Sequence, residues 1–134
     1  MQHKRKSNMA YLNRVFDVRL KAHLKAMGAV LIEGPKWCGK TWTGKNAAAS
    51  EFMLADPKGN FNNKQIAMMD PELVLDGKKP RLVDEWQEAP AIWDAVRGLV
   101  DQKVDKGQFL LINSFFLLFP SQAFVPSFYF NVTS

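Results

Sequence analysis

The stretch Gly34-Pro35-Lys36-Trp37-Cys38-Gly39-Lys40-Thr41 follows the pattern G-x-x-x-x-G-K-[ST], which is typical of the phosphate-binding P-loop. It comes directly after the apolar run Ala29-Val30-Leu31-Ile32 and before a helix-compatible stretch that reaches Ser50. In this order the glycines let backbone N–H groups surround an anion, and the helix adds the positive end of its dipole. The stretch therefore predicts a site for a nucleoside triphosphate.

Each residue type in this motif has a chemical role. Lys40 places a positive charge on the outer phosphates and is a candidate catalytic residue, while the hydroxyl of Thr41 is a candidate Mg²⁺ ligand. Trp42, on the following helix, is predicted to lie in the core. The candidate cofactor-binding residues are Gly34, Pro35, Lys36, Trp37, Cys38, Gly39, Lys40 and Thr41.

Apolar spacing along the chain alternates between helical and extended patterns. Phe16, Leu20, Leu24 and Met27 mark one face of a helix that Gly28 ends, and Ile92, Val96 and Leu99 mark another that Pro90 opens. Short strands are expected at residues 29–32, 51–55, 81–85 and 108–112, a loop at 58–63, and a short helix from Asp70-Pro71-Glu72 to Leu75. This order predicts an α/β fold of the P-loop NTPase type, with a largely parallel sheet flanked by helices.

Two adjacent carboxylates, Asp84 and Glu85, end the apolar strand that starts at Arg81. In a P-loop domain an aspartate at a strand end holds Mg²⁺ together with Thr41, and the next carboxylate polarises the water that attacks the γ-phosphate. We therefore assign Asp84 as a candidate metal ligand and Glu85 as a candidate catalytic residue. Taken alone, an Asp-Glu pair is more often a solvated turn.

Length and charge place the chain among ordinary globular domains. It has 134 residues and a formal net charge of +5, and it holds one cysteine, which fits a reducing cytoplasm. Residues 1–10 include the basic cluster His3-Lys4-Arg5-Lys6, which could touch nucleic acid or an acidic surface but is predicted to be a disordered, solvated leader. No segment is long enough to predict a membrane span, which needs about 20 apolar residues.

The composition changes near the carboxyl end of the chain. Residues 107–134 contain no Asp, Glu, Lys or Arg, and seven of the ten phenylalanines lie there: Phe109, Phe115, Phe116, Phe119, Phe124, Phe128 and Phe130. An uncharged, phenylalanine-rich end is poor surface for a soluble domain. We expect residues 11–114 to be a partial P-loop ATPase domain and residues 115–134 to be an atypical tail, out of frame with the original gene.

The sequence resembles a prokaryotic family of AAA-type ATP-binding proteins, whose members join an N-terminal ATPase domain to a C-terminal domain of unknown function. The resemblance covers residues 11–111 or so. It is carried by Tyr11-Leu12 with Arg14, the whole stretch 28–41, Asp70-Pro71-Glu72-Leu73, the stretch 80–87 (PRLVDEWQ), and Ile92-Trp93-Asp94-Ala95-Val96-Arg97. It implies ATP binding through Gly34–Thr41, Mg²⁺ held by Thr41 and Asp84, and water activation by Glu85.

The resemblance ends after residue 111. In the family this strand continues to a Thr-Gly-Ser turn that senses the γ-phosphate, whereas here Ile112-Asn113-Ser114 follows. Ser114 or Asn113 is the candidate for that role, and Arg97 is the nearest candidate for an arginine finger. We therefore expect a truncated or frameshifted N-terminal part of such a protein, with a fold that is incomplete at its C-terminus.

The expected function is Mg-ATP binding, with slow ATP hydrolysis as the activity that the resemblance implies. Two alternatives stay open. One is a nucleotide-binding remnant without catalysis, and the other is a P-loop kinase acting on a small molecule, which Glu85 beside Asp84 disfavours. A homo-oligomer or a protein partner is compatible with the resemblance, and the sequence does not identify either.

Overall fold

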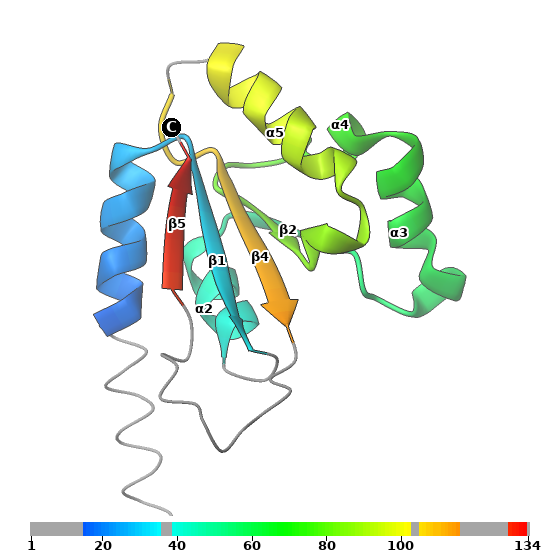
Figure 1. Cartoon of the computed structure of the whole chain (residues 1–134), viewed down its shortest axis with the longest axis horizontal. Helices are drawn as coiled ribbons and strands as arrows, with labels where there is room; N and C mark the ends of the chain where they lie inside the picture. The colour runs from blue at the N-terminus through cyan, green and yellow to red at the C-terminus, as the bar shows by residue number, and fades with distance from the viewer. Residues whose placement is uncertain (1–14, 36–38, 103–104, 116–128, 134) are drawn as a thin grey trace, which may run out of the picture.

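Short apolar strands pair into one sheet at the centre of the molecule. The computed structural model describes residues 15–35, 39–102, 105–115 and 129–133. Strands β1 (Ala29–Pro35), β2 (Ser50–Met53), β3 (Arg81–Asp84) and β4 (Phe109–Phe115) run parallel, and β5 (Tyr129–Thr133) pairs antiparallel with β1. The order across the sheet is β2-β3-β4-β1-β5, and Figure 1 shows β5, β1 and β4 side by side. The α/β class and the parallel sheet predicted from the sequence are confirmed.

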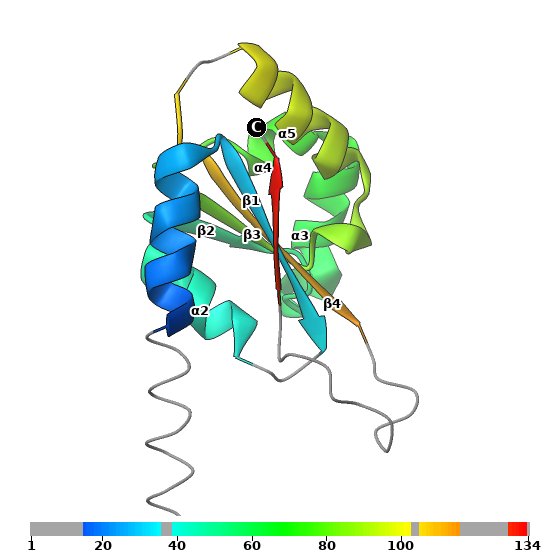
Figure 2. The same cartoon turned by 60° about the vertical axis from the view of Figure 1, so that its left-hand side comes forward.

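Helices cover both faces of this sheet. A helix at residues 15–26 and α2 (Lys40–Ala47) lie on one face, and α3 (Lys58–Met69), α4 (Pro71–Val74) and α5 (Ala91–Gln102) lie on the other (Figure 2). From β1 the chain crosses to β2 at the sheet edge, and through β3 and β4 it returns. Connections between parallel strands of one sheet are nearly always right-handed. A connection that crosses the sheet in one direction therefore places its helix on one face, and a connection that crosses in the other direction places its helix on the opposite face.

Alternate residues of the central strands enter two separate cores. Leu31, Val83 and Leu111 pack with α3–α5, whereas Val30, Leu82 and Leu110 pack with α2 and the N-terminal helix. Because both faces are buried, these strands read as continuous apolar runs in the sequence. The buried strands predicted at residues 29–32, 81–85 and 108–112 are confirmed, and β1 and β4 continue beyond the predicted ends.

Helix α2 approaches the sheet closely at Gly44. A Cβ built on Gly44 would lie 2.7 Å from Cδ1 of Ile112 and 3.1 Å from Cδ1 of Leu82. Glycine weakens a helix by about 1 kcal/mol relative to alanine, but here it lets the backbone of α2 rest on β3 and β4. This contact sets the distance between the start of α2 and the carboxyl end of β3.

The helices that the apolar spacing predicts are present. Ile92, Val96 and Val100 are the buried residues of α5, and Leu20 and Leu24 bury the N-terminal helix. The short helix α4 begins after Asp70, whose carboxylate accepts a hydrogen bond from the backbone N–H of Leu73 (3.3 Å). Residues 1–14, which include the predicted basic leader, lie outside the described residues.

Two local predictions were wrong, and one strand was not predicted. The loop expected at residues 58–63 is the first half of α3, because buried Ala67 and the bond from Asn63 Nδ2 to the Met53 carbonyl (2.9 Å) outweigh poor helix propensity. Trp42 is 55% exposed rather than in the core, since α2 turns Thr43 and Gly44 toward the sheet. No strand was predicted after Ile112, yet β5 adds an edge strand beside β1.

Candidate functional site

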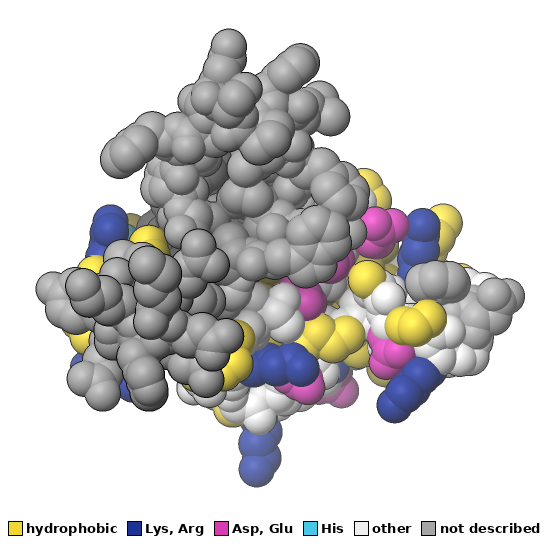
Figure 3. All heavy atoms as spheres, turned by 90° about the horizontal axis from the view of Figure 1, so that it is seen from below, with side chains coloured by type: hydrophobic (Ala, Val, Ile, Leu, Met, Phe, Trp, Pro, Cys, Tyr) yellow, Lys and Arg dark blue, Asp and Glu magenta, His cyan; other side chains and the backbone are white. Residues whose placement is uncertain are grey.

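The predicted site residues gather where β1, β3 and β4 end. The pairing of Gly34 with Ser114 and of Asp84 with Ile112 brings these strand ends to one edge of the sheet. The helix that follows β1 lies on one face and the helix that follows β3 on the other, and such a divergence opens a crevice at the carboxyl ends of the strands. Viewed from this end, Asp and Glu side chains are exposed beside Lys or Arg and hydrophobic side chains (Figure 3).

Gly39, Lys40 and Thr41 form the start of α2. Gly39 adopts φ 93° and ψ 9°, a left-handed conformation that glycine accepts without strain, and its carbonyl accepts a bond from the N–H of Thr43 (3.1 Å). Lys40 is the first helical residue and is only 3% exposed. Gly34 and Pro35 end β1, whereas Lys36, Trp37 and Cys38 lie outside the described residues.

The two predicted metal ligands touch each other. The hydroxyl of Thr41 donates a hydrogen bond of 3.0 Å to Oδ2 of Asp84, which is 43 residues away in the sequence. Asp84 is 9% exposed, and its second oxygen, Oδ1, is buried and has no hydrogen-bond partner among the described residues. A buried acceptor left without a donor is costly, so Asp84 Oδ1 is able to accept a further donor or a cation.

Burial raises the pKa of Asp84, because the charged carboxylate loses its water. The hydrogen bond from Thr41 opposes this shift, and the negative charge of Glu85 adds to it. The backbone N–H of Glu85 and then the positive charge of Lys40 also oppose it. A divalent cation bound to this carboxylate would supply a positive charge that stabilises its ionised form.

The donor set around Thr41 and Asp84 fits Mg²⁺. Hydroxyl and carboxylate oxygens are hard ligands, and Mg²⁺ is usually held by one or two carboxylates together with substrate phosphates and water. Among the described residues no group of three or more His, Cys, Asp or Glu side chains could hold a metal ion by itself.

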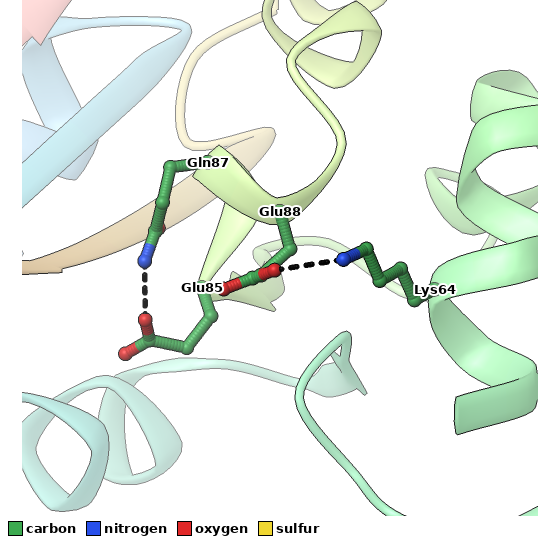
Figure 4. A network of polar contacts seen from close by, with 4 residues as sticks. All are labelled: Lys64, Glu85, Gln87 and Glu88. Atoms are coloured by element: carbon green, nitrogen blue, oxygen red, sulfur yellow. Dashed lines mark hydrogen bonds and ion pairs between the residues drawn. The ribbon is translucent and has the colours of Figure 1, made fainter. Parts of the chain in front are cut away.

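Glu85 turns the chain at the end of β3. Its φ of 59° and ψ of 43° are left-handed, and it leads directly into the 3₁₀ helix η1 (Trp86–Glu88). Its Oε1 accepts a 2.6 Å hydrogen bond from the Ser114 hydroxyl, and its Oε2 accepts a bond from Nε2 of Gln87 (Figure 4). The candidate catalytic carboxylate and the candidate γ-phosphate sensor thus come together from neighbouring strands.

The candidate site residues line a cavity of about 560 Å³. Its lining consists of Gly39, Lys40, Thr41, Trp42, Ala55, Asp84, Glu85 and Ser114. The structure therefore brings together five predicted site residues and one sensor candidate. Arg97, the candidate arginine finger, is exposed on α5 and does not line this cavity.

A second cavity, of about 410 Å³, adjoins the first. Ala55 lines both cavities, and the walls of the second are Leu54, Ala55, Lys64, Gln65, Met68 and Glu88. An ion pair of 3.1 Å joins Lys64 Nζ of α3 to Glu88 Oε2 of η1 (Figure 4). The sequence predicted neither this cavity nor Gln87 as a neighbour of Glu85, because both depend on how α3 and η1 pack.

Replacing Asp84 with Asn is expected to stabilise the nucleotide-free chain at neutral pH. Since burial raises the pKa of Asp84, the folded state holds this proton more tightly than an ordinary carboxyl of pKa 3.8. The stability that Asp84 contributes is thus fully present below about pH 4 and is lost as the pH rises through the folded-state pKa. Asn carries no such proton and keeps an acceptor for Thr41.

The stability advantage of Asp84→Asn should therefore grow as the pH rises through the folded-state pKa of Asp84 and level off above it, because the amide carries no charge that burial would desolvate. Urea unfolding at a series of pH values measures it. The same variant should lose the additional stabilisation that Mg²⁺ brings in the presence of ATP. An advantage that does not change with pH would contradict the role assigned to burial.

Comparison with known proteins gives distant similarity. The chain is similar to an uncharacterized protein of Mycobacterium tuberculosis and to one of Mycobacterium bovis, each 32% identical over 101 residues. Each match covers 72% of this chain and 22% of the relative, so the chain spans less than a quarter of the length of the curated relatives that it matches. No family model matches the chain. No solved structure matches it either.

The described helices carry no membrane-spanning segment. Within those ranges, no helix is both long enough and apolar enough to cross a membrane.

Proposed function

We propose that this chain binds Mg-ATP at the cavity between α2 and the ends of β1, β3 and β4, in a P-loop domain of the AAA type. The observation that carries the proposal is the contact between Thr41 and Asp84, a 3.0 Å hydrogen bond across 43 residues. The unpartnered Oδ1 of Asp84 supports the same reading. A P-loop followed by a helix and a buried carboxylate at the end of another parallel strand is the arrangement that phosphate and Mg²⁺ binding needs.

The residues present suggest how ATP would be held. Lys40 provides the positive charge for the outer phosphates, and the backbone N–H groups at the start of α2 add the dipole of that helix. Thr41 and Asp84 would hold Mg²⁺, which neutralises charge that develops on the phosphates. These groups lie at one end of the sheet, so the charge of Lys40, the helix dipole and the cation would act together on one bound triphosphate.

We further propose hydrolysis rather than binding alone. Glu85 lines the same cavity as Lys40 and Thr41, and its carboxylate is half-buried. It would accept a proton from water as the water oxygen bonds to the γ-phosphorus. The bond from that phosphorus to the β,γ-bridging oxygen then breaks, which gives ADP and inorganic phosphate.

A slow rate is expected for the 134-residue chain. An arginine finger contributes about 10³–10⁵ to the rate in enzymes that use one, and among the described residues no arginine lines the cavity. A nucleotide-binding protein without catalysis therefore stays a candidate. So does a small-molecule kinase, because the cavity beside Ala55 offers room for a phosphate acceptor.

Product analysis separates these functions. The chain is mixed in excess with ATP labelled at the γ-phosphate and Mg²⁺, with and without a metabolite extract. Free phosphate in both mixtures supports the ATPase, whereas labelled metabolite that appears only with the extract supports the kinase. Thermal stabilisation by Mg-ATP without either product supports binding alone, and its absence would overturn the nucleotide site.

A further inference from the structure

Unfavourable local features concentrate in the four residues that follow one another at the end of β3. Glu85 adopts a left-handed conformation, which side chains other than glycine rarely accept. Asp84 Oδ1, Trp86 Nε1 and Gln87 Oε1 are buried and have no hydrogen-bond partner among the described residues. Strain and unsatisfied polar atoms persist at sites where function requires a fixed geometry.

Asp84 and Glu85 already have roles in the proposed function, but Gln87 has none. Its Nε2 donates a hydrogen bond to Oε2 of Glu85, while the Ser114 hydroxyl donates to Oε1 (2.6 Å). In Figure 4 the side chains of Gln87 and Glu85 point toward each other. A flipped amide would press its oxygen against a carboxylate, so Gln87 can serve this carboxylate only as a donor.

We propose that Gln87 is a positioning residue, which holds the carboxylate of Glu85 in the orientation that receives a proton from the attacking water. The inference rests on the proposed function, since it concerns the base of that reaction. Two donors, Gln87 and Ser114, each bind one oxygen of the carboxylate. Rotation about the last torsion of Glu85, which is broad in glutamate, is thereby restricted.

The helix that carries Gln87 is itself held in place. Trp86 stacks on Trp93 of α5 with ring centroids 5.3 Å apart, and Glu88 forms an ion pair of 3.1 Å with Lys64 of α3. Residues on both sides of Gln87 are thus attached to different helices. This anchoring lets a short 3₁₀ helix present one amide in a constant position.

The melting temperature separates a positioning role for Gln87 from a purely structural role. Its Oε1 is buried without a partner among the described residues, so an apolar side chain of similar length removes this unsatisfied atom together with the hydrogen bond from Nε2 to Glu85, and the two changes offset each other. Gln87→Met should therefore leave the melting temperature nearly unchanged. A residue that serves packing or stability would lower the melting temperature when replaced.

The test uses the full 134-residue chain and compares Gln87→Met, Gln87→Glu and wild type. We expect kcat for ATP hydrolysis to fall at least about 10-fold in both variants, a change of about 1.4 kcal/mol in activation free energy, with KM within twofold. Gln87→Glu keeps the shape of the side chain but places an acceptor against Glu85. Gln102→Met, the same change at an exposed end of α5, is the matched control and should behave as wild type.

The outcomes are distinguishable. Wild-type kcat in Gln87→Met, while Glu85→Gln abolishes turnover, would overturn the positioning role and leave the ATPase intact. A fall in kcat that accompanies a lower melting temperature in both Gln87 variants would assign Gln87 to structure instead. Absence of turnover in wild type, with Glu85→Gln indistinguishable from it, would overturn the proposed hydrolysis itself.

Discussion

Glu85→Gln is expected to lower the rate of ATP hydrolysis by about 10²–10⁴-fold, the usual contribution of a general base, while ATP still binds. The amide has nearly the shape of the carboxylate, and its oxygen can still accept the hydrogen bond from Ser114. It cannot take a proton from water near neutral pH, so the chemical step is slowed. Single-turnover release of labelled phosphate measures the rate, and an ATP-dependent shift in melting temperature measures binding.

A matched control is Glu51→Gln, which makes the same change at an exposed position of β2. It should turn over ATP at the wild-type rate. Unchanged turnover in Glu85→Gln would remove Glu85 from the mechanism, and the water would then need another base or none. Loss of ATP binding in Glu85→Gln would mean that the carboxylate holds the nucleotide or its cation directly.

Lys40→Ala is expected to weaken ATP binding at least about 100-fold, a loss of about 2.7 kcal/mol. Lys40 begins α2 and is 3% exposed at the cavity, so its charge acts on a bound phosphate with little screening by water. At an ATP concentration of 100 times Kd, wild type should gain about 2.7 kcal/mol, on the order of 10 °C in melting temperature. The variant should show almost none of this shift.

Lys40→Met guards against a loss of folding, because its side chain fills most of the same volume without the charge. Lys45→Met changes the exposed lysine in the last turn of the same helix and serves as the control. Isothermal titration with ATP and Mg²⁺ gives the dissociation constants directly. If ATP affinity in Lys40→Met lies within threefold of wild type, the proposed phosphate site is wrong.

Local sequence was enough to predict the elements that carry the site. The P-loop pattern is contiguous, and the apolar runs at 29–32 and 82–83 indicate strands buried on both faces of a sheet. Side chains at the carboxyl ends of parallel strands meet at one edge, so Thr41 and Asp84 could be expected to meet across 43 residues. Their contact agrees with that expectation.

Other features of the site left little trace in the sequence. Gln87 stands two residues after Glu85, which on a strand would place the two side chains on one face, but the chain has already turned into η1. Its contact with Glu85 depends on the left-handed backbone at Glu85, and no residue type there signals that conformation. The amino end of α3 was also not predictable from the sequence. Gly59, Asn62 and Asn63 have low helix propensity, and only the packing of α3 makes this segment helical.

The sequence by itself determined that this chain is an α/β protein, that a P-loop sequence pattern precedes a helix, and that two carboxylates lie at the end of another strand. Each of these features lies in a short contiguous stretch, where spacing and residue type are sufficient to predict it. Only the tertiary structure decided that β4 lies between β1 and β3, which brings Ser114 to Glu85. It also decided that α3 and η1 meet through Lys64 and Glu88. Strand order and helix packing depend on the apolar surface that is buried in both cores together. No single stretch of sequence contains that information.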